Sequence, residues 1–271
     1  MKIDGKAIAL ELLKHLKIRV DKLKEKGIIP HLCIITFGKN PQTESYLKQK
    51  ILRSEQIGAK ITIKKFDEDV NQEIIYDLIG DLNGDKKVNG IIVQRPLPKS
   101  FEEFKICKAV KKEKDVDGFY PGSPFDPPVA LAVIELIKNT KPNIALNTKK
   151  IALVGKGTTA GKPIISFFEK MNIQTIKIDS KTQNANKILK SADIIVSSVG
   201  KKIINSSNIK NGVILIGVGM HTENGKLKGD YEETEIEKIA KAYTPTPGGV
   251  GPVNVTMLMK NLVEASENQN R

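Results

Sequence analysis

A short apolar run, Ile151–Val154, leads into a glycine-rich turn and then into a helix-like segment at residues 164–171. This is the order of elements in a dinucleotide-binding βαβ unit. Gly155 and Gly157 let the backbone turn tightly and approach a pyrophosphate, and Ala160 fits the small third position. The N–H groups at the start of the helix attract anions. The stretch predicts a phosphate site, although a strand-to-helix turn without a ligand has the same pattern.

The next strand pattern, at residues 173–178, ends in Asp179. In dinucleotide-binding folds, an acidic residue about 20 positions beyond the turn accepts a hydrogen bond from the adenosine ribose. Asp179 lies at about this separation, which favours a nucleotide over a plain turn.

Strand and helix patterns alternate through the rest of the chain. Apolar residues recur at helical spacing over residues 4–26, with Gly27 as a stop. Further helices are predicted at 41–57 and 71–82, and strands at 31–37, 61–66, 88–93, 151–154, 173–178, 193–196 and 213–216. This alternation indicates parallel sheets that are covered by helices on both faces.

A polar, proline-broken stretch at residues 138–149 separates two such α/β units. We expect residues 1–140 together with 254–271 to form one domain, and residues 141–253 to form a second, Rossmann-like dinucleotide-binding domain. Each is long enough to bury its own core. The predicted fold class is α/β, with two open-sheet domains.

The 271 residues carry a formal charge of +13, which raises the question of a nucleic-acid partner. The lysines are spread along the whole sequence, and apolar residues interrupt the densest run, at 105–114. There is no Trp, and Phe and Tyr do not alternate with basic residues as a base-stacking surface requires. We therefore expect no nucleic-acid partner. Attraction of anionic small molecules and a plain lysine-rich surface both remain open.

Cys33 and Cys107 are far apart in the sequence and match no metal or redox spacing. We interpret both as buried thiols in a reducing compartment and expect no metal site. The N-terminus lacks the apolar segment of a signal peptide, and no stretch approaches the roughly 18 apolar residues of a membrane span. A cytoplasmic protein that does not bind membranes is expected.

Tyr46 and Lys50 are candidates for a site in the first domain. Asn40 is placed to cap a helix that starts at Pro41, and Tyr46 and Lys50 fall four positions apart on one face of that helix. A helix that follows a strand end can point such a pair into a cleft above the sheet. A surface pair has the same spacing, so the residues alone leave both interpretations open.

Gln94 and Asp117 are further candidates in this domain. Gln94 follows the strand predicted at 88–93, and ligands of open α/β sheets bind at the carboxyl ends of the strands. Asp117 lies in an Asp-Val-Asp-Gly sequence that is otherwise typical of a turn.

Residues 243–254 contain three glycines and three prolines, among them Pro247, Gly248 and Gly249. They predict a rigid loop that a ligand can approach closely, and an interdomain hinge is the alternative. Asn254 is placed to cap a final helix.

Four motifs, in this order, resemble those of the bifunctional methylenetetrahydrofolate dehydrogenase/cyclohydrolase family. The family's Asn-Pro-x-Ser-x-x-Tyr-x-x-x-Lys resembles residues 40–50, and its Gly-x-x-Val-Gln-x-Pro-Leu-Pro stands at 90–98. Its Lys-Asp-Val-Asp-Gly-Phe stands at 114–119 and its highly specific Pro-Gly-Gly-Val-Gly-Pro at 247–252. The resemblance covers nearly the whole chain.

The resemblance implies oxidation of 5,10-methylenetetrahydrofolate by a nicotinamide cofactor, then hydrolysis of the cationic methenyl product to 10-formyltetrahydrofolate, in a folate cleft between the two domains. Lys50 would take and return a proton if desolvation lowers its pKa, and Gln94 would orient its amine. Tyr46 would offer a ring face to the folate. Asp117 would bind pterin N–H groups and favour the methenyl cation. The implied substrate-binding residues are Tyr46, Gln94, Asp117, Pro247, Gly248 and Gly249.

The resemblance also implies a cofactor bound at the glycine-rich turn. Lys156 and Ser180 suit the 2′-phosphate of NADP, whereas Asp179 repels it and suits the free ribose hydroxyl of NAD. We expect NADP on family grounds, with NAD as the alternative because of Asp179. The implied cofactor-binding residues are Gly155, Lys156, Gly157, Thr158, Ala160, Gly161, Asp179 and Ser180.

Residues 120–129 depart from the family pattern, because this segment is shorter and lacks both an Asn-x-Gly-x-Leu and a Pro-Cys-Thr-Pro motif. It would border the folate and cofactor clefts, so an enzyme with only the dehydrogenase or only the cyclohydrolase activity is an alternative. A basic nucleic-acid-binding or regulatory protein on the same fold is another. Tetrahydrofolate derivatives are the expected small-molecule partners, and the family suggests a homodimer.

Overall fold

The computed structural model describes residues 1–120, 122–141 and 143–270, and the chain divides into two compact units. Met1–Ala9 and Val129–Asn254 form a unit with a five-stranded sheet, and Leu10–Pro128 with the chain from Val255 onward forms a unit with a three-stranded sheet. We call them the five-stranded and the three-stranded unit. We expected residues 1–140 in the first domain, but residues 1–9 and 129–140 group with the five-stranded unit.

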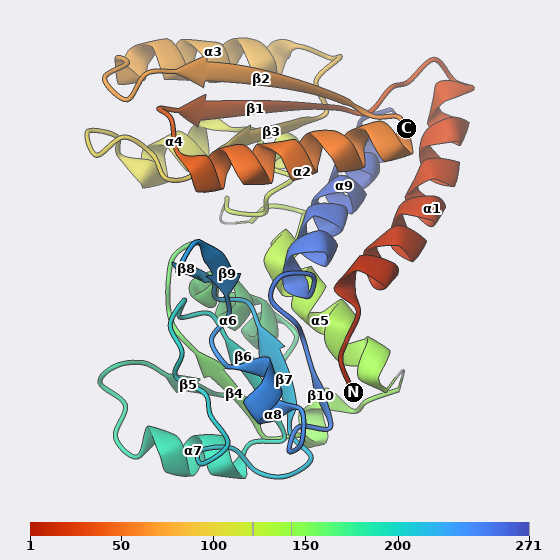
Figure 1. Cartoon of the computed structure of the whole chain (residues 1–271). Helices are drawn as coiled ribbons and strands as arrows, with labels where there is room; N and C mark the ends of the chain where they lie inside the picture. Colours follow the sequence, from red (N-terminus) through yellow and green to blue (C-terminus); the bar gives the residue numbers. More distant parts are fainter. Residues whose placement is uncertain (121, 142, 271) are drawn as a thin grey trace. The chain divides into compact units, whose positions relative to one another are not determined.

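In the three-stranded unit, β1 (His31–Phe37) lies between β2 (Lys60–Phe66) and β3 (Gly90–Val93), and both pairings are parallel (Figure 1). Alternate residues of β1 face opposite sides of the sheet. Leu32 and Ile34 pack in one core cluster with α1, α2 and α9, and Cys33 and Ile35 pack in another with α3 and α4. The helices are α1 (Gly5–Lys24, in part), α2 (Pro41–Ile57), α3 (Gln72–Gly84), α4 (Glu103–Ala109), the 3-10 turn η1 (Lys112–Lys114) and α9 (Val250–Gln269, in part).

In the five-stranded unit all neighbouring strands of the main sheet are parallel, in the order β10-β7-β6-β4-β5 (Figure 1). The chain passes from β4 outward to β5 and then returns to the other side of β4 with β6. The order therefore reverses between β4 and β6, which is where doubly wound sheets bind ligands. The strands are β4 (Ile151–Val154), β5 (Thr175–Ile178), β6 (Ile194–Ser197), β7 (Ile214–Gly217) and β10 (Ala242–Tyr243), with the antiparallel hairpin β8 (His221–Glu223) and β9 (Lys226–Lys228).

The helices of this unit are α5 (Pro128–Thr140), α6 (Gly161–Lys170), α7 (Ala185–Ser191) and α8 (Glu233–Ile236), and a 3-10 turn, η2 (Leu146–Thr148), precedes β4. Helix α5 and η2 occupy half of the stretch expected as a boundary at 138–149, in which Pro142 lies outside the described residues. The boundary between the two units falls instead between Pro128 and Val129.

The predicted strand at 31–37, the strand at 151–154 and the helix at 41–57 are confirmed residue for residue. The assignment of Asn254 as a helix cap is wrong, because α9 already begins at Val250 and Asn254 lies inside it. Pro252 does not prevent this early start, since proline is tolerated in the first turn of a helix.

Cys33 is buried in the sheet, but Cys107 on α4 is only partly buried, which corrects the expectation of two buried thiols. Within the three described ranges of the chain, no helix is both long and apolar enough to cross a membrane.

Candidate active site

Helix α2 begins where the sequence predicts and places Tyr46 and Lys50 one turn apart. The side-chain Oδ1 of Asn40 accepts a hydrogen bond from the backbone N–H of Thr43 at 3.3 Å. This caps the first turn of α2 and confirms the predicted role of Asn40.

Lys50 is buried, with 8% of its surface exposed, and its Nζ donates a hydrogen bond to Oε1 of Gln94 at 2.7 Å. Gln94 stands directly after β3, and its backbone N–H donates to the carbonyl of Ile35 at 2.8 Å. Its side-chain Nε2 donates to the carbonyl oxygen of Arg95 at 2.9 Å. The amide is therefore held with its oxygen toward the lysine amine.

Burial lowers the pKa of Lys50, because a desolvated ammonium is disfavoured, and the negative charge of Asp117 opposes this more weakly. The direct partner of the amine is a neutral amide rather than a carboxylate. Burial also raises the pKa of the Tyr46 phenol, which keeps that side chain neutral. The Lys50 ammonium therefore loses its proton more readily than that of an exposed lysine.

The two acids of the Asp-Val-Asp sequence differ in environment. Asp115 is buried, accepts a hydrogen bond from the backbone N–H of Tyr120 at 2.7 Å, and burial raises its pKa to about 6. Asp117 is only partly buried, and its charge acts on Lys50. Asp115 thus shapes the turn, and Asp117 is the acid available to a ligand. The sequence analysis did not separate these roles.

The shortened segment at 120–129, in which Pro121 lies outside the described residues, is tied to the rest of this unit. Ser123 Oγ donates to the carbonyl of Asp115 at 3.1 Å. The Nδ2 of Asn261, a buried residue of α9, donates to the carbonyls of Val116 and Asp126, both at 2.9 Å. Asn261 has no recognisable sequence signal, because its partners are backbone groups.

Arg95 was missed by sequence reasoning and links several parts of the site. Its Nε donates to Oε1 of Glu103 at 2.7 Å, and its Nη2 donates to Sγ of Cys107 at 3.1 Å. Its guanidinium stacks 3.7 Å from the ring centroid of Phe119. Because Arg95 follows Gln94 and Phe119 lies two positions after Asp117, these contacts connect the two segments that carry the candidate residues.

The glycine-rich turn after β4 follows the sequence prediction at Gly155, whereas Gly161 rather than Ala160 makes the close packing expected at the third position. Gly155 has φ +97°, which favours glycine, and a Cβ on Gly161 would come within 2.4 Å of the Gly155 carbonyl oxygen. Nothing lies within 4 Å of the Cβ position at Gly157, so this part of the backbone is open to a ligand. Thr158 is exposed, Ala160 is the residue before the first turn of α6, and both flank the open backbone.

Lys156 and Asp179, which gave conflicting cofactor signals, are paired. Nζ of Lys156 lies 2.7 Å from Oδ2 of Asp179. This contact, with hydrogen bonds from the backbone N–H of Lys181 and the hydroxyl of Thr182, lowers the pKa of Asp179 to about 2. Ser180 is exposed beside them. The carboxylate is charged at neutral pH and partly neutralised by Lys156.

The loop with Pro247, Gly248 and Gly249 belongs to the five-stranded unit, whereas Tyr46, Lys50, Gln94 and Asp117 belong to the three-stranded unit. The Thr246–Pro247 peptide is cis, and Gly248 has φ +104°. A Cβ on Gly5 would lie 1.9 Å from the carbonyl oxygen of Gly249, so this close approach requires a glycine at position 5. The rigidity of the loop stays a prediction.

Comparisons with known proteins agree with these features. Residues 3–117 match the catalytic domain of tetrahydrofolate dehydrogenase/cyclohydrolase, and residues 127–270 match its NAD(P)-binding domain. The bifunctional protein FolD of Staphylococcus epidermidis is 39% identical over 276 residues, which cover 98% of this chain and 96% of that protein.

Two solved structures are also similar to this chain. Bifunctional FolD from Campylobacter jejuni superimposes with a TM-score of 0.93 and 32% identity over 99% of both chains. The Trypanosoma brucei enzyme, solved with NADP and an inhibitor, has a TM-score of 0.93 and 28% identity over 100% of this chain and 98% of that one.

The fold and the two matched domains define a nicotinamide-dependent enzyme of folate metabolism. The chain belongs to the tetrahydrofolate dehydrogenase/cyclohydrolase family. The family, the two-domain α/β class and the bifunctional enzyme class expected from the sequence are thereby confirmed.

Proposed function

We propose that the chain oxidises 5,10-methylenetetrahydrofolate with NADP and hydrolyses the methenyl product, and that Lys50 moves the proton in the second step. The observation that carries this proposal is the buried Lys50 amine, which is held 2.7 Å from the amide oxygen of Gln94 and has a lowered pKa. Family membership supports the substrate class.

In the proposed hydrolysis, water attacks the cationic carbon between the two folate nitrogens, and the neutral amine of Lys50 accepts a proton from it. The carbon–nitrogen bond to the pterin breaks as the remaining hydroxyl becomes a carbonyl, and its proton passes to the departing nitrogen. The proton on Lys50 then leaves to solvent. Gln94 keeps the amine oriented, and Asp117 stabilises the cationic reactant.

The cofactor is proposed to bind at the turn after β4. The open backbone at Gly157 and the close packing of Gly155 with Gly161 fit a pyrophosphate that approaches the start of α6. When bound, the nicotinamide supplies the electron acceptor for the oxidation. Lys156 and Ser180 support NADP, as does the bound NADP of the Trypanosoma brucei relative. NAD is the second candidate, because Asp179 suits a free ribose hydroxyl.

The proposed substrate contacts also include the ring of Tyr46 and the loop at Pro247, Gly248 and Gly249. The close packing of Gly249 against Gly5 supports the proposal, because a backbone that is already packed loses little freedom when it binds. On the family resemblance alone, we also propose a homodimer that acts in the cytoplasm.

The test is absorbance of the purified protein with 5,10-methylenetetrahydrofolate and either NADP or NAD, following reduced cofactor and methenyl product together. Reduced cofactor without methenyl accumulation is expected. Accumulation of the methenyl product would indicate a dehydrogenase alone, and hydrolysis of added methenyltetrahydrofolate without cofactor reduction would indicate a cyclohydrolase alone. The proposal would be overturned if the protein carried out neither of the two reactions.

A further inference from the structure

Asp230 is a buried acid that neither proposed reaction step uses. It follows β9, has 0% of its surface exposed, and accepts hydrogen bonds through both carboxylate oxygens. Oδ2 accepts from the hydroxyl of Ser197 at 2.5 Å and the N–H of Val199 at 3.1 Å. Oδ1 accepts from the N–H groups of Gly200 at 2.7 Å and Lys201 at 3.0 Å. A buried carboxylate needs such compensation, because its desolvation is unfavourable.

Two glycines make room for this carboxylate. A Cβ on Gly219 would lie 2.4 Å from both oxygens of Asp230. Gly200 has φ +70°, which orients its N–H toward Oδ1 at little conformational cost. The backbone around Asp230 is therefore built for the acid, and the acid in turn determines the path of residues 199–201.

That path runs beside the glycine-rich turn. Residues 198–201 leave the carboxyl end of β6, the neighbour of β4 at the point where the strand order reverses. The backbone N–H of Ser198 donates to the carbonyl of Val154 at 2.8 Å, and its hydroxyl donates to the same oxygen at 3.1 Å. The Cβ position at Gly155 lies 2.9 Å from that hydroxyl. Residues 198–201 thus support the turn from one side.

We propose that Asp230 is a positioning residue for cofactor binding, which holds residues 198–201 against the Gly155 turn and keeps the crevice between β4 and β6 in shape. This inference rests on the proposed function, because it requires a dinucleotide at that turn. Asp230 does not need to touch the cofactor, and the hydrolysis of the methenyl compound does not need Asp230.

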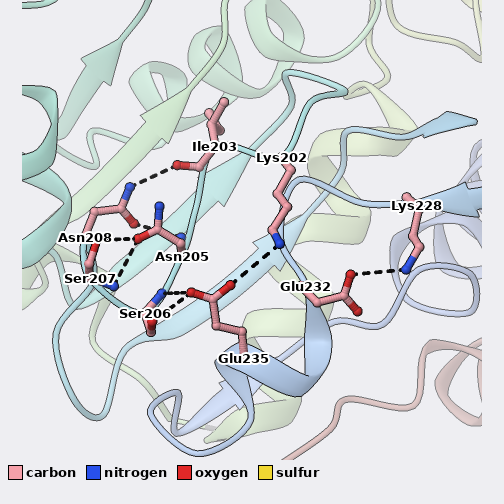
Figure 2. Close-up of polar contacts among 9 residues, drawn as sticks. All are labelled: Lys202, Ile203, Asn205, Ser206, Ser207, Asn208, Lys228, Glu232 and Glu235. Carbon is pink, nitrogen blue, oxygen red and sulfur yellow. Dashed lines mark hydrogen bonds and ion pairs between the residues drawn. The ribbon is translucent and has the colours of Figure 1, made fainter. Parts of the chain in front are cut away.

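Glu235 offers a matched control, because its carboxylate binds the next part of the chain after β6. Figure 2 shows Glu235 of α8, whose Oε1 accepts from both the N–H and the hydroxyl of Ser206 at 2.7 Å. Nζ of Lys202 lies 3.7 Å from its other oxygen. Like Asp230, Glu235 binds the chain after β6 through a carboxylate, but its partners Lys202 and Ser206 lie further along the sequence than those of Asp230.

The experiment compares Asp230→Asn with Glu235→Gln by titration calorimetry with NADP and by separate assays of the two reactions. At the Oδ1 position the NH₂ group of the new amide faces the N–H groups of Gly200 and Lys201, and at the Oδ2 position it faces the N–H of Val199. At least one hydrogen bond from a backbone donor is therefore lost in either orientation. We expect the NADP dissociation constant and KM to rise about tenfold or more in Asp230→Asn. Hydrolysis of methenyltetrahydrofolate without cofactor should stay within about twofold of wild type, as should every parameter of Glu235→Gln.

Ser197→Ala is the milder variant for the case that Asp230→Asn does not fold, and it should weaken NADP binding about threefold with unchanged hydrolysis. Wild-type NADP affinity in the folded Asp230→Asn protein would overturn the inference. If Asp230→Asn is unfolded, wild-type NADP affinity in Ser197→Ala would overturn the inference. Equal losses of the dehydrogenase and hydrolysis activities in a folded Asp230→Asn protein would also overturn it. A wild-type enzyme that binds neither NADP nor NAD would instead overturn the proposed function.

Discussion

Lys50 and Lys156 both lie near the carboxyl ends of strands in a parallel sheet, yet they differ in burial and in the partner of the amine. Lys50 is 8% exposed and donates to the neutral amide of Gln94. The side chain of Lys156 is 44% exposed and pairs with the carboxylate of Asp179 at 2.7 Å. Burial lowers the pKa of Lys50, whereas the Lys156 pair keeps Asp179 ionised with a pKa of about 2.

This difference shows that burial and partner, rather than residue type, decide what a lysine can do. A desolvated amine beside a neutral acceptor loses its proton more readily and suits proton transfer. A hydrated ammonium beside a carboxylate stays charged and suits recognition of a phosphate. Substitutions at the two lysines and at their neighbours test whether proton transfer and phosphate recognition are divided in this way.

The largest effect is expected for Lys50→Met, which removes the proton acceptor but keeps a side chain of similar length. Hydrolysis of methenyltetrahydrofolate should fall by a factor on the order of 10² to 10⁴, the usual contribution of general acid–base catalysis. The assay follows the loss of methenyl absorbance without nicotinamide cofactor. Lys48→Met, at an exposed position of the same helix, is the control and should hydrolyse like wild type. Hydrolysis by Lys50→Met within about tenfold of wild type would assign the proton transfer to another group.

A smaller effect is expected for Arg95→Met, because Arg95 acts on the site through Gln94 and Phe119. Loss of its contacts with Glu103, Cys107 and Phe119 should lower kcat/KM for hydrolysis roughly threefold to tenfold by loosening both segments. Steady-state kinetics should show both a lower kcat and a higher KM.

Cys107→Ala removes only the thiol contact of Arg95 and should change hydrolysis by less than about twofold. An effect of Cys107→Ala as large as that of Arg95→Met would mean that general packing at α4, not the guanidinium, is responsible.

At the other lysine, Asp179→Ser removes the charge that opposes a 2′-phosphate and releases Lys156 from its pair. The ratio of kcat/KM for NADP to kcat/KM for NAD should rise on the order of tenfold. Lys156→Met should lower this ratio. Since the pair is exposed to solvent, both changes should shrink as the salt concentration rises. An unchanged ratio in both variants would place cofactor discrimination outside this pair.

Much of the first site could be predicted because its signals are local. The cap at Asn40, the helix from Pro41 and the one-turn spacing of Tyr46 and Lys50 all follow from residues close in sequence. The contact between Lys50 and Gln94 is not local, and it was expected only because Gln94 ends a buried strand. The roles of these residues in catalysis stay predictions.

Other features left no trace in the sequence pattern. Helix α5 was missed because most of its residues are apolar and buried, and periodicity alone does not separate such a short apolar run from a buried strand. Asp230 and Asn261 form hydrogen bonds with backbone groups. Every residue type has such groups, so these partners leave no signal in the sequence. Arg95 lies in a motif at a position that the resemblance leaves unspecified. Such partners become visible only when the fold brings the segments together.

The smallest effect concerns stability and has the opposite sign from the effect on activity. Lys50→Met should raise the free energy of unfolding by about 1 kcal/mol at pH 7, because an apolar side chain replaces a desolvated amine, and the melting temperature should rise by roughly 2–4 °C. Gln94 is partly exposed, so water can reach its vacated oxygen. Lys48→Met should stay within about 0.5 kcal/mol of wild type.

The pH dependence of this stability gain distinguishes desolvation from packing. Because burial lowers the pKa of folded Lys50 below the ordinary 10.5, the unfolded chain binds the proton more tightly than the folded chain. Wild-type stability is therefore lost as the pH falls from about 10.5 toward the folded pKa, and the advantage of Lys50→Met should appear over that window and fade above it. Melting curves at neutral and strongly alkaline pH measure the difference. An equal gain at both pH values would attribute it to packing rather than to the charge of Lys50.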